Sequence, residues 1–205
     1  MKPKEEYTTK KTGLFQTETL FFYTYIAHNG LIFKTTAASL DFCRKLRDRW
    51  QRHLSASFTG HRHITDRQRT AKKVMEAIML CYNDGVRFFY AGGAMGFDTI
   101  AAESVIKLRY DYPDIVLILV VPFPEQDKLF SEGDRKRYVE ILGQADEVVT
   151  ISNSYSDYAY LKRNDYMISH SSRLIAYWDG HSLGGTSYTV RRAKEKKLAI
   201  YNLSV

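Results

Sequence analysis

The chain has 205 residues, of which 44% are hydrophobic and 26% are charged. These values are typical of a globular protein with one well-buried core, and they exclude a largely disordered chain. The net charge is +7, but residues 1–55 hold 10 of the 30 Lys and Arg and 5 of the 23 Asp and Glu. The rest of the chain is nearly neutral, which argues against a broad DNA-binding surface there.

Cysteine use and hydropathy indicate a cytoplasmic protein without a membrane partner. Cys43 and Cys81 lie in expected helices without a Cys-x-x-Cys spacing, so we predict buried free thiols in a reducing compartment. The apolar residues 20–27 are far fewer than the roughly 20 that a membrane helix needs. They also lack the cleavage signature of a secretory signal. The six histidines are scattered, so no metal site is expected.

Residues 1–54 are predicted to form an N-terminal extension. Residues 1–13 are typical of a flexible tail, and residues 20–27 and 31–33 are expected to pair as a hairpin, because Asn29-Gly30 suits a type I′ turn. Residues 37–53 predict a helix that is rich in arginine. This helix carries either a solvated basic face or a contact for nucleic acid or a partner protein, through Arg44, Arg47, Arg49 and Arg52.

Residues 55–205 alternate between apolar runs and helical patterns. Strands are expected at residues 56–58, 87–91, 115–121, 147–151, 173–178 and 198–201, and helices at 66–83, 97–110, 131–143, 158–171 and 185–196. Residues 115–121 are apolar without alternation, as in a parallel strand that helices cover on both faces. The pattern predicts an α/β fold, doubly wound and Rossmann-like, with about six mostly parallel strands.

The unusual motifs of this domain follow its strands, where ligands bind in such folds. Gly60-His61-Arg62 comes after the first strand, and its arginine can bind a phosphate. Gly92-Gly93-Ala94-Met95-Gly96 and Asp98 come after the second. This loop is neither a dinucleotide fingerprint nor a Walker loop. Asp98 either caps its helix or accepts hydrogen bonds from a ribose or base.

Three further motifs complete the candidate ligand-binding residues. Pro122-Phe123 form a stiff exit from the most apolar strand, either as a structural turn or as a ligand contact. Arg163-Asn164 lie in a tyrosine-rich helix, whose rings either pack in the protein or stack on a base. The last motif runs from Asp179 to a second glycine-rich turn, in which backbone amides and a hydroxyl are expected to bind phosphate: Gly184, Gly185 and Thr186.

Taken in order, these motifs resemble the YpsA-like family of the SLOG (SMF/DprA and LOG) superfamily of Rossmann-like proteins. The resemblance covers about residues 55–203, leaving the N-terminal extension outside. It implies a nucleotide pocket built from these loops. The LOG branch hydrolyses nucleoside monophosphates with an arginine and a glutamate after its glycine loop, whereas here Ser187-Tyr188-Thr189-Val190 follow. Asp98, Glu125 and Asp179 remain as substitutes for that acid.

We therefore expect a protein that binds a nucleotide or nucleotide-sugar derivative, as a sensor or accessory protein that requires no cofactor. The first alternative is a LOG-like N-glycosidase of nucleoside monophosphates. The second is the single-stranded DNA binding of the DprA branch, for which the arginines of residues 37–53 would supply the charge. If the protein binds a nucleotide or nucleotide-sugar derivative, we expect its phosphate to be held by Gly93, Gly96, Gly185 and Thr186. A homo-oligomer is compatible with the sequence.

Overall fold

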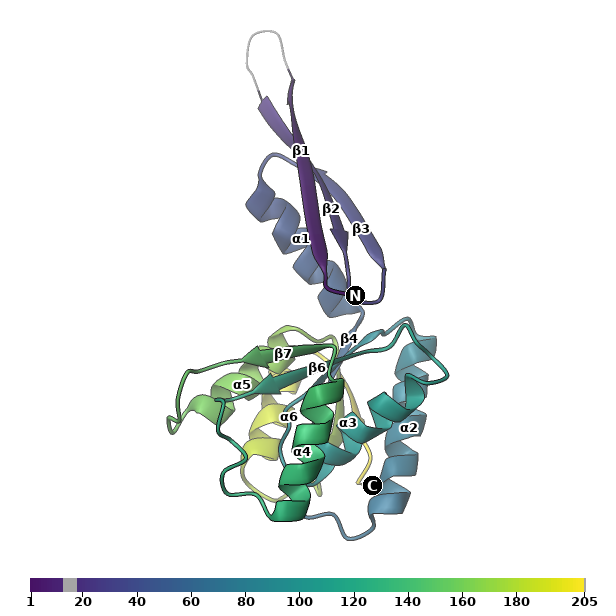
Figure 1. Ribbon diagram of the computed structural model, residues 1–205, viewed down its shortest axis with the longest axis vertical. Coiled ribbons are helices and arrows are strands. Elements are labelled where there is room, and N and C mark those ends of the chain that lie inside the picture. The colour runs from purple at the N-terminus through teal and green to yellow at the C-terminus, as the bar shows by residue number, and fades with distance from the viewer. Residues whose placement is uncertain (13–17, 205) are drawn as a thin grey trace. The chain divides into compact units, whose positions relative to one another are not determined.

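The computed structural model describes residues 1–12 and 18–204 and divides the chain into two units, Met1–His53 and Leu54–Val205. The first unit is a three-stranded antiparallel sheet of order β1-β2-β3, with β1 at Lys4–Thr12, β2 at Glu18–Ile26 and β3 at Ile32–Ala37. One helix, α1 at Leu40–His53, packs on one face of this sheet (Figure 1).

The hairpin and the helix of this unit are confirmed, but two details of the prediction are wrong. Residues 4–12 form β1 and not a flexible tail. The turn between β2 and β3 spans residues 27–31, and it is not type I′, because that turn needs a positive φ at both central residues. Gly30 has a φ of +82°, but the φ of Asn29 is not positive. Its side chain instead accepts a hydrogen bond from the amide of Leu31 (3.2 Å).

Glu5 explains why so polar a strand as β1 is held in place. Its carboxylate pairs with Arg44 (2.5 Å) and Arg47 (3.2 Å) of α1 and accepts a hydrogen bond from the hydroxyl of Tyr23 (3.0 Å). The guanidinium of Arg44 lowers the pKa of Glu5, while burial raises the pKa of Tyr23 to about 12. Two of the four helix arginines therefore hold the unit together.

The second unit is a six-stranded, wholly parallel sheet of order β7-β6-β5-β4-β8-β9. Its strands are β4 (Ser55–Gly60), β5 (Phe88–Ala91), β6 (Val116–Val121), β7 (Glu147–Thr150), β8 (Arg173–Tyr177) and β9 (Ala199–Asn202). Its helices are α2 (Arg67–Asn83), α3 (Phe97–Leu108), α4 (Glu132–Gln144), α5 (Ala159–Ser169) and α6 (Gly185–Glu195). The predicted doubly wound α/β fold is confirmed.

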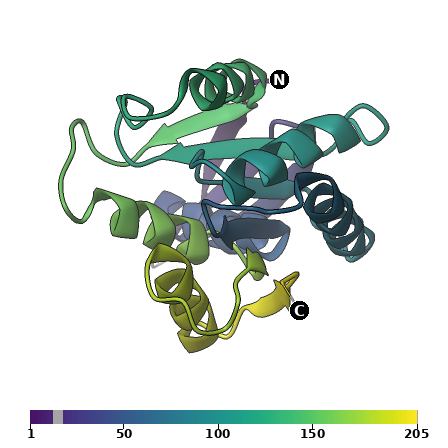
Figure 2. The same ribbon diagram turned by 90° about the horizontal axis from the view of Figure 1, so that it is seen from below.

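Helices cover both faces of this sheet. Helices α3 and α4 contact each other on one face, whereas α5 and α6 contact each other on the opposite face (Figure 2). All six residues of β6 are buried, as expected for a strand covered on both sides. Asp66 caps α2 by accepting a hydrogen bond from the amide of Arg69 (2.9 Å). The thiols of Cys43 and Cys81 are both free and buried, as predicted, and burial raises the pKa of Cys81 to about 11.

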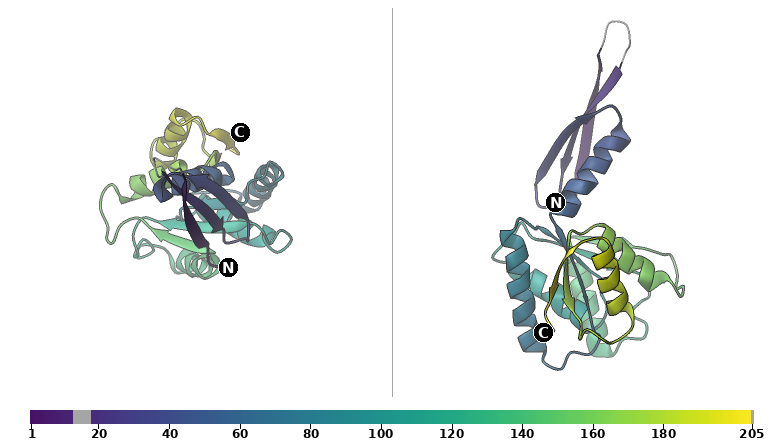
Figure 3. Two further views of the ribbon diagram at one scale, coloured as in Figure 1. Left: turned by 90° about the horizontal axis from the view of Figure 1, so that it is seen from above. Right: turned by 180° about the vertical axis from the view of Figure 1, so that it is seen from behind.

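The strand order places the switch point between β4 and β8. The chain runs outward from β4 through β5 and β6 to β7, then returns to β8 on the other side of β4 (Figure 3). The loops after β4 and β8 therefore lead to helices on opposite faces and leave a crevice between them. Ligands of doubly wound folds bind in such a crevice.

Candidate functional site

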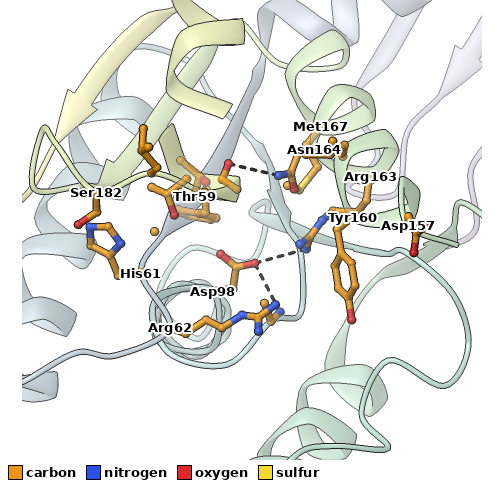
Figure 4. Close-up of a pocket in the computed structure, with 18 residues that line it drawn as sticks. Thr59, His61, Arg62, Asp98, Asp157, Tyr160, Arg163, Asn164, Met167 and Ser182 are labelled. Atoms are coloured by element: carbon orange, nitrogen blue, oxygen red, sulfur yellow. Dashed lines mark hydrogen bonds and ion pairs between the residues drawn. The ribbon is translucent and has the colours of Figure 1, made fainter. Parts of the chain in front are cut away.

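A pocket of about 580 Å³ lies at this switch point. Figure 4 shows side chains from four segments around it: the end of β4, the start of α3, the helix α5 and the loop before α6. Ten of the predicted ligand-binding residues line the pocket, namely Gly60, His61, Arg62, Ala94, Asp98, Arg163, Asn164, Gly184, Gly185 and Thr186. The structure therefore brings residues of four predicted motifs together around one pocket.

A buried ion pair forms the floor of the pocket. Arg163 of α5 and Asp98 of α3 are 5% exposed each, with 3.4 Å between Nη1 and Oδ2. The same carboxylate oxygen accepts a hydrogen bond from the amide of Ala94 (3.4 Å), and the Nε of Arg163 has no partner among the described residues. Burial raises the pKa of Asp98 and lowers that of Arg163, and the attraction between them opposes both shifts. The buried Nε of Arg163 is therefore a donor left without an acceptor in the described part of the chain.

The glycines of the first loop do not line the pocket, and Gly92 packs against the ion pair. A Cβ at Gly92 would lie 1.5 Å from Nη1 of Arg163, and a Cβ at Gly96 would lie 2.2 Å from the carbonyl oxygen of Arg62. Gly93, with a φ of +65°, packs against Gln126 and Tyr138. These positions need glycine for close packing.

The second glycine-rich loop is open. Gly184 is the N-cap of α6, and neither Gly184 nor Gly185 is closely covered, since the nearest atom to a Cβ at Gly185 is Nδ2 of Asn164 at 3.7 Å. The first backbone amides of a helix have no acceptor within the helix. The start of α6 therefore presents amides and the positive end of the helix dipole to the pocket, beside the hydroxyl of Thr186.

Asp179 shapes this second loop and does not line the pocket. Its carboxylate accepts hydrogen bonds from the amides of His181 (3.1 Å) and Ser182 (2.8 Å) and from the hydroxyl of Ser182. The Ser182 hydroxyl makes the largest contribution to lowering the pKa of Asp179. The amide of Asp179 donates to Nε2 of His61 (3.2 Å), which joins the loop to the end of β4.

The remaining predicted residues lie beside the pocket. Met95 lines a smaller adjoining hollow, which shares Arg62, Ala94 and Tyr160 with the main pocket. Phe123 is buried and contacts the ring of Tyr160 edge-on, with 5.6 Å between centroids. Pro122 accepts a hydrogen bond from the amide of Ser152 through its carbonyl (3.0 Å). Phe123 could therefore affect a ligand in the main pocket through the position of Tyr160, and Met95 could contact a ligand that extends into the smaller hollow.

Several lining residues were missed by the sequence reasoning. Among them are Asp157 and Tyr160 at the start of α5, and Ser182 and Leu183 in the loop before α6. Figure 4 shows Tyr160 and Asp157 on the α5 side of the pocket and Ser182 beside His61. The tyrosine-rich composition of residues 155–166 was the available signal, because one of its rings does line the pocket.

The fold and this switch-point pocket define a doubly wound, Rossmann-like domain with a helix N-terminus exposed in its crevice. Within that class, the YpsA family model, described as the YspA SLOG family, matches residues 62–204. The chain therefore belongs to this SLOG family, as its motifs predicted. No helix in the described part of the chain is both long and apolar enough to span a membrane.

Relatives in sequence are UPF0398 proteins of bacilli. One from Halalkalibacterium halodurans is 36% identical over 141 residues, covering 67% of this chain and 72% of the relative. One from Bacillus cereus is 34% identical over 128 residues, covering 61% of this chain and 70% of the relative.

Solved structures of DNA processing protein A share the fold. The Streptococcus pneumoniae protein is 16% identical, with a TM-score of 0.52 over 71% of this chain and 48% of that one, so this chain matches about half of its length. The Helicobacter pylori protein is 17% identical, with a TM-score of 0.51 over 95% of this chain and 79% of that one. Identities this low indicate a shared fold and nothing more.

Proposed function

We propose that the pocket binds a nucleotide or nucleotide-sugar derivative, and that the protein works as a sensor or accessory protein. The observation that carries this proposal is that one pocket has hydrogen-bond donors at one end and a carboxylate acceptor at the other. The start of α6 offers amides and a hydroxyl for phosphate, and Asp98 offers a carboxylate acceptor for sugar hydroxyls. A phosphorylated sugar has both groups.

Charge supports the placement of the phosphate at α6. At the other end of the pocket the charge of Arg163 is already paired with Asp98, whereas Gly185 and Thr186 offer donors without an acceptor at the positive end of a helix. Arg62 lines the same pocket and has no ion pair within 4.0 Å among the described residues; its charge attracts Asp98 and can also neutralise a phosphate. Tyr160 would then lie beside the base or sugar.

The test is a thermal-shift screen of nucleoside monophosphates, diphosphates and ADP-ribose. A ligand at 100 times its Kd stabilises the folded state by about 2.7 kcal/mol. We expect a rise in Tm for the wild type that Gly185→Asp abolishes, because its carboxylate would occupy the phosphate position. Gly133→Asp is the matched control, since Gly133 also lies in the first turn of a helix, α4, with open space around it. No response to any of these compounds would contradict the proposal.

One observation favours an N-glycosidase as a second candidate. Of the three acids considered as substitutes for the LOG glutamate, Asp98 lines the pocket within the described residues, whereas Glu125 and Asp179 do not. A buried carboxylate with a raised pKa beside an arginine is a common feature of catalytic sites. This candidate predicts that chromatography detects free base released from a nucleoside monophosphate, and that Asp98→Asn stops the release.

The structure of Helicobacter pylori DNA processing protein A describes a single-stranded DNA binding mode. For this chain, single-stranded DNA binding remains a proposal. Two of the four helix arginines are already engaged, because Arg44 and Arg47 pair with Glu5.

A further inference from the structure

The sheet of the N-terminal unit has one face covered by α1 and one face open. Trp50 of α1 packs against Tyr25 and Phe33, with ring centroids 6.4 and 5.4 Å apart. Side chains alternate between the faces of a strand, so the even-numbered residues of β2 and β3 lie on the other face. On that face Phe22 is 44% exposed and Ile32 is 57% exposed.

This open face is built around Phe22 at the centre of the sheet. The register places Thr8 of β1 and Thr36 of β3 directly opposite Phe22 on either side. A shallow hollow of about 280 Å³ lies here, lined in part by Phe22, Thr24, Lys34 and Thr36. The exposed ring of Phe22, with a threonine on each side, is therefore available to stack on a planar group of a binding partner.

Unpaired positive charge also lies on this face. Lys10 is opposite Leu20, and Lys34 is opposite Thr24, so both lysines share the face of Phe22. Neither forms an ion pair among the described residues, and both are exposed. Glu6 on this face is paired with Lys4 at 2.5 Å, which leaves Glu18 at the end of β2 as an unpaired acid.

Part of the charge of the arginine-rich helix is neutralised. Arg44 and Arg47 pair with Glu5, Arg47 also pairs with Asp48, and Lys45 pairs with Asp41. These contacts engage two of the four arginines that the sequence assigned to a nucleic-acid contact. The lysines of the sheet remain available for phosphates.

We propose that the open face of β1, β2 and β3 binds single-stranded DNA, with a base stacked on Phe22 and phosphates beside Lys10 and Lys34. Stacking on an aromatic side chain needs an unpaired base, which selects a single strand over a duplex. Threonine methyl groups on this face suit the C5-methyl group of thymine, which uracil lacks. An oligothymidylate is therefore the probe of choice.

The first test is fluorescence anisotropy of the full chain with a labelled oligothymidylate. Phe22→Ala is expected to weaken binding about tenfold or more, because it removes the stacking platform. Phe42→Ala is the matched control, since Phe42 is 52% exposed but lies on α1. This control is expected to bind as the wild type does.

The second test is the dependence of binding on salt. Replacing Lys10 and Lys34 together by glutamine removes two phosphate contacts, so the slope of log K against log salt is expected to fall by about 1.4. The control carries Lys11→Gln and Lys72→Gln, which remove the same charge from exposed positions outside the open face. Its slope is expected to match the wild type.

Four outcomes would overturn the proposal. These are the absence of oligothymidylate binding to the wild type, equal affinities of the Phe22→Ala and Phe42→Ala variants, and tighter binding of oligouridylate or duplex DNA. The fourth is a wild type that sediments as a homodimer together with a Phe22→Ala variant that sediments as a monomer and binds DNA normally. The open face would then be a contact between two copies of the chain. If Arg62→Gln loses DNA binding and Phe22→Ala keeps it, the DNA binds in the pocket and not on the open face.

Discussion

The two loops are both rich in glycine but have opposite environments. Residues 91–96 are largely buried, and added side-chain atoms at Gly92 or Gly96 would collide with Arg163 or with backbone. Residues 180–185 are exposed, and a Cβ at Gly180 or Gly184 would meet no atom within 4 Å. The first loop uses glycine to let structural elements approach one another, and the second leaves backbone amides accessible.

The carboxylates beside the two loops differ in the same way. Asp98 is buried behind the first loop, and burial raises its pKa. Asp179 precedes the second loop, and hydrogen bonds from Ser182 and His181 lower its pKa. A glycine-rich sequence therefore does not by itself indicate a phosphate site, because the surrounding packing decides whether its amides are free.

The largest expected effect comes from adding a methyl group to each loop. Gly92→Ala places a Cβ 1.5 Å from the Arg163 guanidinium, so we expect it to lower the free energy of unfolding by about 3 kcal/mol or more. Gly185→Ala meets no atom closer than 3.7 Å, and we expect a change within about 1 kcal/mol. Urea unfolding measures both, and equal losses would contradict the contrast between the loops.

A second large effect is expected from breaking the buried ion pair. Arg163→Met leaves the carboxylate of Asp98 buried without its cation, which costs about 3–5 kcal/mol. Adding Asp98→Asn to this variant removes the unpaired charge and should restore part of the stability. A double variant no more stable than Arg163→Met would show that the pair is not coupled as its geometry requires.

The fold followed well from the sequence, because apolar runs such as residues 115–121 and helical periodicity do not depend on distant contacts. β1 could not be predicted, since its side chains are polar and mostly exposed, and it is held by backbone pairing to β2 and by Glu5. The candidate site was predicted at the level of loops. Which glycines line the pocket depends on the packing of Arg163 against Gly92, and no local pattern reports this contact.

The pH dependence of stability should have opposite signs at the two carboxylates. Because the folded-state pKa of Asp98 is raised, the folded protein binds its proton more tightly, and this group makes stability fall as pH rises from the usual range of an aspartate towards the raised value. The lowered pKa of Asp179 contributes stability above the usual aspartate range, which is lost as pH falls through the folded-state value. We therefore expect the plot of unfolding free energy against pH to lose the fall due to Asp98 in Asp98→Asn, and the rise due to Asp179 in Asp179→Asn. If both variants keep the wild-type pH dependence, neither carboxylate contributes as stated.

The smallest effect is expected at Thr186. Thr186→Val removes one hydroxyl from the start of α6, so ligand affinity should fall by about 1 kcal/mol, or roughly fivefold. Stability should change by less than about 0.5 kcal/mol, because Thr186 is half-buried and forms no hydrogen bond through its side chain within the described residues. Calorimetric titration and thermal unfolding separate these two quantities, and a loss of stability without a loss of affinity would assign Thr186 a structural role.

The most direct test of the difference between the loops is amide NMR during titration with the nucleotide that gives the largest thermal shift. We expect the amide resonances of Gly185 and Thr186 to move strongly while those of Gly92 and Gly93 stay nearly fixed. Large shifts confined to residues 92–96, with Gly185 and Thr186 unmoved, would contradict it.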